Sequence, residues 1–139
     1  MINARENLLN TTNKLLIAGL NHGASGNCSC RDRGGFLITP TGIDSSKLTT
    51  DMMVRMNLSD DLPQPESKYQ PSSEWQFHQA ILEKYPEINA VVHTHSVFAS
   101  SLSVLGQEIP AFHYMIAVAG GNSVRCAPYA MFGTKELSD

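Results

Sequence analysis

Hydrophobic positions recur with two different periods along this chain of 139 residues, and each period predicts its own kind of element. Between Asn3 and Gly19, leucines return three and four positions apart, which predicts an amphipathic helix that the glycine ends. The leucines of this apolar face are Leu8, Leu9, Leu15, Leu16 and Leu20. A glycine-rich loop over residues 21–27 follows, so the helix is expected to lead into a tight connection.

Short apolar runs bounded by turn residues predict strands in the following part of the chain. The runs at 28–31 and 36–39 flank Asp32-Arg-Gly-Gly35, a sequence typical of a hairpin turn. One helical turn is expected near Lys47. Further strands are predicted at 51–56, at 124–127, and at Ala90–Val92 leading into His93 and His95.

Two more helices are marked by their caps. Ser72-Ser73-Glu74 begins one of them, because serine is a favoured N-cap and an acid suits the first turn; Pro86 closes it. Ser96 begins the other and Gly106 ends it. Its apolar side chains, expected to pack inward, are Val97, Phe98, Leu102 and Leu105.

Two polar segments complete the pattern. Residues 59–71 include Pro63, Pro65 and Pro71 and are expected to form an exposed excursion between strands or a loop into the next helix, rather than a domain linker. The last residues, Thr134–Asp139, have the cap and first turn of a helix. A helix of six residues is marginal alone, so we expect this chain to be a fragment or a truncated product.

Composition narrows the class of protein. With 139 residues, 42% of them apolar and 17% charged, the chain fits one globular domain over 1–139. The net charge of −3 gives no basic patch and argues against a nucleic-acid partner. The sequence has no apolar run of membrane-spanning length and no signal-peptide pattern, and its three cysteines are an odd number. These features predict a cytoplasmic protein without membrane contact, in which Cys28 and Cys30 are small buried residues.

The most informative polar residues are His93 and His95. On an extended strand, side chains two apart share a face, with alpha carbons roughly 6–7 Å apart. Two imidazoles at this spacing can bind one metal ion, although the spacing does not choose between zinc, copper, nickel and iron. The alternative is a pair of strand histidines that are exposed at an edge or hydrogen-bonded to neighbours.

Glu74 is a candidate third ligand. At the start of a helix it can simply be a partner of the helix dipole. If that helix end lies beside the strand of His93, the carboxylate becomes a metal ligand or a base near the metal, as in catalytic zinc sites with two histidines and a glutamate. His78, one turn after Glu74, is an alternative ligand, but a solvent-facing histidine or one that supports a ligand is the expected role.

Three short segments of small residues can bind an anion through backbone N–H groups and polar side chains. They are Gly26-Asn27, Thr41-Gly42 and Ser72-Ser73. Each alone is also ordinary turn chemistry, but together with a metal site they favour a phosphorylated substrate. Tyr114, in an apolar run, is either a packing residue or a proton donor that reaches the site from a neighbouring subunit.

Taken together, these motifs resemble the class II aldolase/adducin family over nearly the whole chain and in order. The matching segments are Gly23-Ala-Ser-Gly-Asn-Cys-Ser29, Leu37-Ile-Thr-Pro-Thr-Gly-Ile43, Pro71-Ser-Ser-Glu-Trp75, Ala90-Val-Val-His-Thr-His95, Ile109-Pro-Ala-Phe-His-Tyr-Met-Ile-Ala117, Gly120-Gly-Asn-Ser123, Cys126-Ala-Pro-Tyr-Ala130 and Phe132-Gly-Thr134. The resemblance implies a three-layer α/β fold, incomplete at the C-terminus, with a central, mostly antiparallel sheet between helices. It also implies a cyclic homotetramer with sites between subunits.

The resemblance further implies a reaction and a set of residue roles. The reaction is zinc-dependent cleavage of a ketose 1-phosphate, of the L-fuculose 1-phosphate type, to dihydroxyacetone phosphate and an aldehyde such as L-lactaldehyde. Each subunit would hold one zinc ion through His93 and His95, with Glu74 as a ligand in the resting site and as the catalytic base once substrate displaces it. Tyr114 would be the proton donor, and Phe132 would line the aldehyde side. The substrate phosphate would be held by Gly26, Asn27, Thr41, Gly42, Ser72 and Ser73.

One feature of the family pattern is missing from the sequence. The family completes its zinc site with a third histidine, and the chain has no candidate after His113. We therefore expect weak zinc binding and slow or no turnover from these 139 residues. Alternatives within the family are a sugar-phosphate 4-epimerase, a decarboxylase or a dehydratase, and outside catalysis an adducin-like interaction module.

Overall fold

The computed structural model describes residues 3–59 and 67–139 and divides into two compact units. The first unit comprises the chain up to His95 together with Ala130–Asp139, and the second is Ser96–Tyr129. The expectation of a single domain over 1–139 stays a prediction. No helix in the described ranges is long and apolar enough to cross a membrane.

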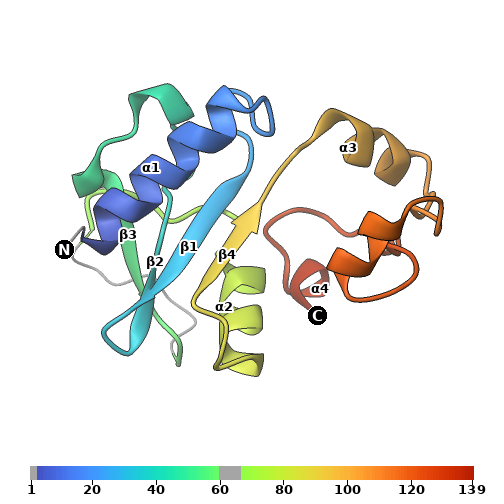
Figure 1. The fold of residues 1–139 in the computed structure, drawn as a ribbon. Coiled ribbons are helices and arrows are strands. Elements are labelled where there is room, and N and C mark those ends of the chain that lie inside the picture. Colours follow the sequence, from blue (N-terminus) through green and yellow to red (C-terminus); the bar gives the residue numbers. More distant parts are fainter. Residues whose placement is uncertain (1–2, 60–66) are drawn as a thin grey trace. The chain divides into compact units, whose positions relative to one another are not determined.

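The first unit is built on a four-stranded antiparallel sheet in the order β3-β2-β1-β4 (Figure 1). The strands are β1 (Asn27–Asp32), β2 (Gly35–Ile38), β3 (Val54–Asn57) and β4 (Ala90–His93). The predicted hairpin is confirmed as β1–β2, with Asp32 opposite Gly35. On the other side of β1, Asn27 lies opposite His93 of β4.

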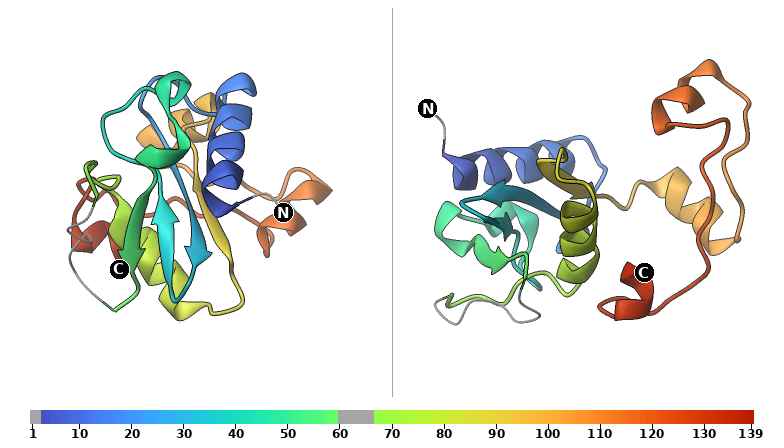
Figure 2. Two further views of the ribbon diagram at one scale, coloured as in Figure 1. Left: turned by 90° about the vertical axis from the view of Figure 1, so that its left-hand side faces the viewer. Right: turned by 90° about the horizontal axis from the view of Figure 1, so that it is seen from below.

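Helices cover both faces of this sheet (Figure 2). Alternation along β2 directs Leu37 to the face of α1 (Ala4–Ile17), and Phe36 and Ile38 to the face of α2 (Trp75–Lys84). The cluster under α1 contains Leu8, Cys28, Leu37, Leu48 and Met53. The cluster under α2 contains Phe36, Ile38, Val54, Met56 and Leu82. The predicted three layers are therefore present.

The helix predicted at the N-terminus is confirmed, and its start has a clear cause. The Asn3 side chain accepts from the Arg5 backbone N–H at 2.7 Å, while Glu6 accepts from the Asn3 N–H at 3.1 Å. This reciprocal capping satisfies N–H groups that the first turn cannot pair. Cys28 is buried beneath the helix, as expected for a small core residue, and Cys30 is partly buried.

Two strand predictions are wrong in part or entirely. The strand expected over 51–56 begins only at Val54, because Thr50–Met52 forms a 3₁₀ turn. Arg5 donates to the carbonyls of Thr50 and Met53 and so holds this turn against α1.

The strand expected over 124–127 is absent. Ile109 and Val124 exchange two backbone hydrogen bonds of 2.9 Å as an isolated bridge. Pro110, next to Ile109, has no N–H to extend the ladder. A single bridge of this kind does not make a strand.

The remaining helices are short. In the second unit, α3 (Val97–Val104) is confirmed as a helix, but none of its side chains is buried. Phe98 is 87% exposed, so the expectation of inward packing is wrong within this chain, because the unit has no second layer to cover the helix. The 3₁₀ segment η3 (Tyr114–Ala119) follows. In the first unit, α4 (Lys135–Ser138) confirms the helix expected after Thr134.

The polar segment predicted at 59–71 lies partly outside the described residues, since 60–66 are not described. At its end, Pro71 forms an isolated bridge with Pro40. The Ser72 N–H also donates to the Thr39 carbonyl at 3.0 Å. These contacts fix the start of α2 beside the end of β2.

Candidate metal centre

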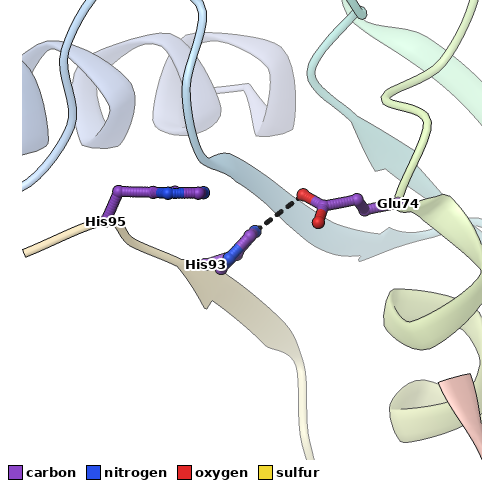
Figure 3. Close-up of side chains that lie close together, drawn as sticks. All are labelled: Glu74, His93 and His95. Carbon is purple, nitrogen blue, oxygen red and sulfur yellow. Dashed lines mark ion pairs between the residues drawn. The ribbon is translucent and has the colours of Figure 1, made fainter. Parts of the chain in front are cut away.

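Three side chains from separate parts of the sequence converge at one end of the sheet (Figure 3). Glu74 precedes the first residue of α2, His93 is the last residue of β4, and His95 lies two residues further on. One ligand atom from each of the three lies within 4.8 Å of the others. The predicted cluster is therefore assembled in the first unit.

His95 reaches the cluster by a route that strand periodicity does not describe. β4 ends at His93, so the two histidines do not share a strand. The buried Asn21 side chain instead fixes the backbone on both sides of Thr94. It donates to the His93 carbonyl at 3.3 Å and accepts from the His95 N–H at 3.0 Å. The two imidazole ring centres are thereby 4.7 Å apart.

Glu74 is held toward His93 by a neighbouring amide. Its Oε2 lies 2.9 Å from His93 Nδ1 and accepts a 2.8 Å hydrogen bond from Asn27 Nδ2. The close His93 ring lowers the pKa of Glu74 most, and Asn27 and His95 act in the same direction, while burial opposes them. The carboxylate is therefore held in its ionised, ligand-competent form.

The surroundings of His93 Nδ1 indicate whether the cluster suits a metal ion. It is near enough to Glu74 Oε2 for an ion pair, yet the direction between the atoms does not give a hydrogen bond. Among the described residues this buried nitrogen has no hydrogen-bond partner. Its contact with a polar atom is the 2.9 Å approach to the Glu74 carboxylate, and a metal ion held by this cluster would use its lone pair. Two imidazoles and a carboxylate fit a divalent transition metal.

His78 does not join the cluster. It is fully buried on α2, where Nε2 lies 2.5 Å from Asn27 Oδ1 and Nδ1 lies 2.7 Å from Ser29 Oγ. Burial, assisted by the charge of His93 and opposed by that of Glu74, lowers the pKa of His78 to about 3. Of the two roles expected for it, supporting a ligand is the one this geometry favours; solvent exposure is wrong.

A cleft of about 220 Å³ opens beside the cluster, within the first unit. Its lining includes most of the residues predicted to bind substrate: Gly26, Asn27, Thr41, Ser72, Ser73 and Phe132, together with Glu74 and His95. Gly42 follows Thr41 in the chain but does not line the cleft. Phe132 lies at the cleft because the next residue, Gly133, packs on the Ser73 backbone. A Cβ at position 133 would lie 3.0 Å from the Ser73 carbonyl oxygen, so glycine allows this close approach.

Comparison with known proteins agrees with this architecture. The model of the family described as Class II Aldolase and Adducin N-terminal domain matches residues 6–139. This chain belongs to that family. It is 49% identical over 132 residues to L-fuculose phosphate aldolase of Escherichia coli (strain K12), covering 95% of this chain and 60% of the relative.

A second curated relative and a solved structure also resemble this class II aldolase/adducin family member. It is 46% identical over 138 residues to the 5-methylthioribulose-1-phosphate/5-deoxyribulose-1-phosphate aldolase of Escherichia coli O45:K1 (strain S88 / ExPEC), covering 99% of this chain and 63% of that protein. A solved structure of L-fuculose 1-phosphate aldolase matches with a TM-score of 0.88 and 38% identity, over 97% of this chain and 63% of that one. The chain thus spans about 60% of the length of these relatives.

Tyr114 lies in the second unit of the class II aldolase/adducin chain, at the first position of η3, and is 80% exposed. Its role as proton donor stays a prediction. The roles of the residues in the first unit likewise stay predictions, although these residues lie close together.

Sequence reasoning missed the importance of Asn21 and the contacts of His78. Asn21 precedes a glycine-rich loop and looks like ordinary turn chemistry. The one available signal was Gly26. Its φ is +68°, and a Cβ there would come within 2.3 Å of Asn21 Nδ2, so the loop needs glycine to leave room for the asparagine.

Proposed function

We propose that this chain carries the metal- and phosphate-binding part of a zinc-dependent aldolase acting on a ketose 1-phosphate. The observation that supports it is the convergence of Glu74, His93 and His95 beside a cleft lined by small polar residues. When bound by these three residues, zinc would act as a Lewis acid that polarises a carbonyl oxygen and stabilises the negative charge that remains after a proton is lost.

The residues of the chain supply the proton transfers. In the condensation direction, Glu74 takes a proton from the carbon beside the ketone of dihydroxyacetone phosphate. That carbon then forms a bond with the aldehyde carbon, and Tyr114 gives a proton to the aldehyde oxygen. Cleavage runs through the same transfers in reverse. The depressed pKa of Glu74 keeps the carboxylate ionised, so that the form with a free proton-accepting oxygen is present, and it also makes this carboxylate a weaker base than an ordinary glutamate.

The cleft is proposed to hold the phosphate end of the substrate. Hydroxyl groups of Thr41, Ser72 and Ser73, with the Asn27 amide and the backbone near Gly26, can donate to phosphate oxygens. The role predicted for Gly42, which lies outside the cleft lining, stays a prediction. Fixing this end places the ketone near the metal ligands. Phe132 is proposed to contact the apolar end of the aldehyde.

The substrate is proposed to be L-fuculose 1-phosphate or a close ketose 1-phosphate. The relatives named above include one named for L-fuculose phosphate and one named for 5-methylthioribulose-1-phosphate and 5-deoxyribulose-1-phosphate. Both names refer to a phosphorylated ketose, which supports a ketose 1-phosphate as the substrate class. They differ in the part of the sugar that becomes the aldehyde.

The site is proposed to lie between subunits of a cytoplasmic homotetramer. The 80% exposure of Tyr114 supports this, since a proton donor presented at a surface can enter a neighbouring subunit's site. The three cysteines are free thiols, as in a reducing compartment.

The test measures zinc affinity and release of dihydroxyacetone phosphate by the chain, with L-fuculose 1-phosphate and 5-deoxyribulose 1-phosphate as substrates. Glu74→Gln and His93→Ala should lower zinc affinity at least about tenfold. Glu83→Gln, an exposed acid on the same helix, is the matched control and should not. Zinc binding without release of dihydroxyacetone phosphate, but with an epimerised, decarboxylated or dehydrated product, would replace the aldolase by another reaction of the family. Absence of zinc binding would favour an interaction module.

A further inference from the structure

A line of three hydrogen bonds connects the middle of β1 with Glu74 through the interior. Ser29 Oγ lies 2.7 Å from His78 Nδ1, His78 Nε2 lies 2.5 Å from Asn27 Oδ1, and Asn27 Nδ2 donates to Glu74 Oε2 at 2.8 Å. Ser29, His78 and Asn27 are all buried. Ser29 and Asn27 face α2 from one side of β1 because they are two positions apart on the strand.

The ionised Glu74 carboxylate at the end of this line decides which group donates in each of the three hydrogen bonds. An ionised carboxylate only accepts, so the Asn27 amide must present its NH₂ group to Glu74. The Asn27 oxygen then faces His78, which must donate from Nε2 and can accept at Nδ1 from the Ser29 hydroxyl. The other neutral tautomer would place a lone pair of Nε2 against the Asn27 oxygen.

We propose that His78, as the neutral imidazole protonated at Nε2, is a positioning residue that fixes the Asn27 amide and through it aims Glu74 at the metal ligands. This rests on the proposed function in so far as Glu74 binds a metal. His78 does not itself line the cleft, and its hydrogen bond toward the site goes to Asn27, which does.

The neutral state is consistent with the surroundings of His78. Phe77 stacks on its ring with centroids 4.5 Å apart, and Leu82 lies on the same buried side of α2. Burial among these groups places the pKa of His78 at about 3. A Leu at position 78 would keep the packing volume but remove the donor to Asn27, whereas Gln can donate from near the place of Nε2.

The first experiment needs no metal. Long-range ¹H–¹⁵N NMR of the wild-type chain at pH 7 should show His78 protonated at Nε2 only. Exchange of the Asn27 side-chain NH₂ protons should be at least about tenfold faster in His78→Leu than in wild type, because the amide loses its anchor. His78→Gln should restore slow exchange. Leu82→Ala, which shortens a buried apolar side chain on the same helix and keeps the backbone carbonyl that accepts from Arg31, controls for loss of stability.

The second experiment uses zinc alone as the probe. His78→Leu should weaken zinc binding about tenfold or more, as found when a group that orients a ligand is removed. His78→Gln should stay within about threefold of wild type, and Leu82→Ala should lose no more than that.

Three results would overturn the proposal: protonation of His78 at Nδ1, unchanged Asn27 exchange and zinc affinity in His78→Leu, or an equal loss of affinity in Leu82→Ala. If wild type binds no zinc, the proposed function fails, but the His78 tautomer and the Asn27 exchange still decide the positioning role. If His78→Leu does not fold, the tautomer in wild type and exchange in His78→Gln decide it.

Discussion

Gly26 lies directly against the buried side chain of Asn21, with no room for even one additional carbon between them. A Cβ at position 26 would come within 2.3–2.4 Å of three Asn21 side-chain atoms. Asn21 in turn holds the backbone at His93 and His95. A glycine in a surface loop therefore sets the position of two candidate metal ligands.

Gly26→Ala should lower both stability and zinc affinity. The change adds a Cβ at φ +68° and also displaces Asn21, so we expect a loss of about 2–3 kcal/mol in the free energy of unfolding. Gly34→Ala is the matched control, because Gly34 has a φ of +82° with nothing within 4 Å of its Cβ position. It should cost about 1 kcal/mol and leave zinc affinity unchanged. Urea unfolding and zinc titration measure both effects; equal losses in the two variants would contradict the role of Asn21.

Arg31 should contribute strongly to stability although it lies far from the cleft. Its guanidinium donates to the carbonyls of Leu82, Tyr85 and Ile88, and so ties the end of α2 to β1. Arg31→Met should cost about 2–3 kcal/mol in urea unfolding, because all three carbonyls lose a charged donor and the contacts to Leu82 and Ile88 are partly buried. Lys84→Met, on the exposed side of the same helix end, should cost less than about 1 kcal/mol. Similar costs for the two variants would show that the Arg31 contacts add little.

His78 should make the protein sensitive to acid. Its pKa is about 3 in the folded chain against an ordinary value of 6.5. Between these values the unfolded chain binds a proton that the folded chain does not, so the free energy of unfolding falls as the pH falls from 6.5 toward 3. The slope due to this group is at most about 1.4 kcal/mol per pH unit.

Urea unfolding of the metal-free chain between pH 4 and 7 measures this slope. His78→Gln should flatten it, whereas His22→Gln, which changes an exposed histidine, should not. A slope that stays the same in His78→Gln would mean that His78 titrates alike in both states.

Cys28 should resist alkylation in the folded protein. It is 1% exposed, and burial raises the pKa of its thiol from 9.0 to about 11. At pH 8 the thiolate fraction then falls from about one in ten to about one in a thousand, and the thiolate is the reactive form. Mass spectrometry after iodoacetamide treatment should find the partly exposed Cys126 modified first. In guanidinium chloride the two should react alike; equal rates in the folded chain would contradict the burial of Cys28.

Local patterns predicted much of the fold. The leucines of the first helix, the Asp32–Gly35 turn and the polar residues before α2, α3 and α4 gave elements that the structure contains. Thr134 caps α4 with its side chain as predicted, whereas the N-cap of α2 is Glu74 rather than a serine, and neither Glu74 nor Ser96 of α3 makes a side-chain cap hydrogen bond. Their signals lie within a few residues of one another, where spacing and capping act directly. The strand expected at 124–127 failed because pairing depends on the partner, and Pro110 limits what that partner can offer.

The sequence by itself determined which side chains are chemically capable of forming the site: a His-x-His pair, an acid at a helix start, and three small-residue segments. It also determined the family, since the motifs occur in order along the chain. Only the tertiary structure decided how the site is held. His95 is placed by Asn21 rather than by strand alternation, and Glu74 is aimed by Asn27 and His78. These contacts join residues 47–74 positions apart, where no local periodicity applies, so they exist only once the sheet has brought β1, β4 and α2 together.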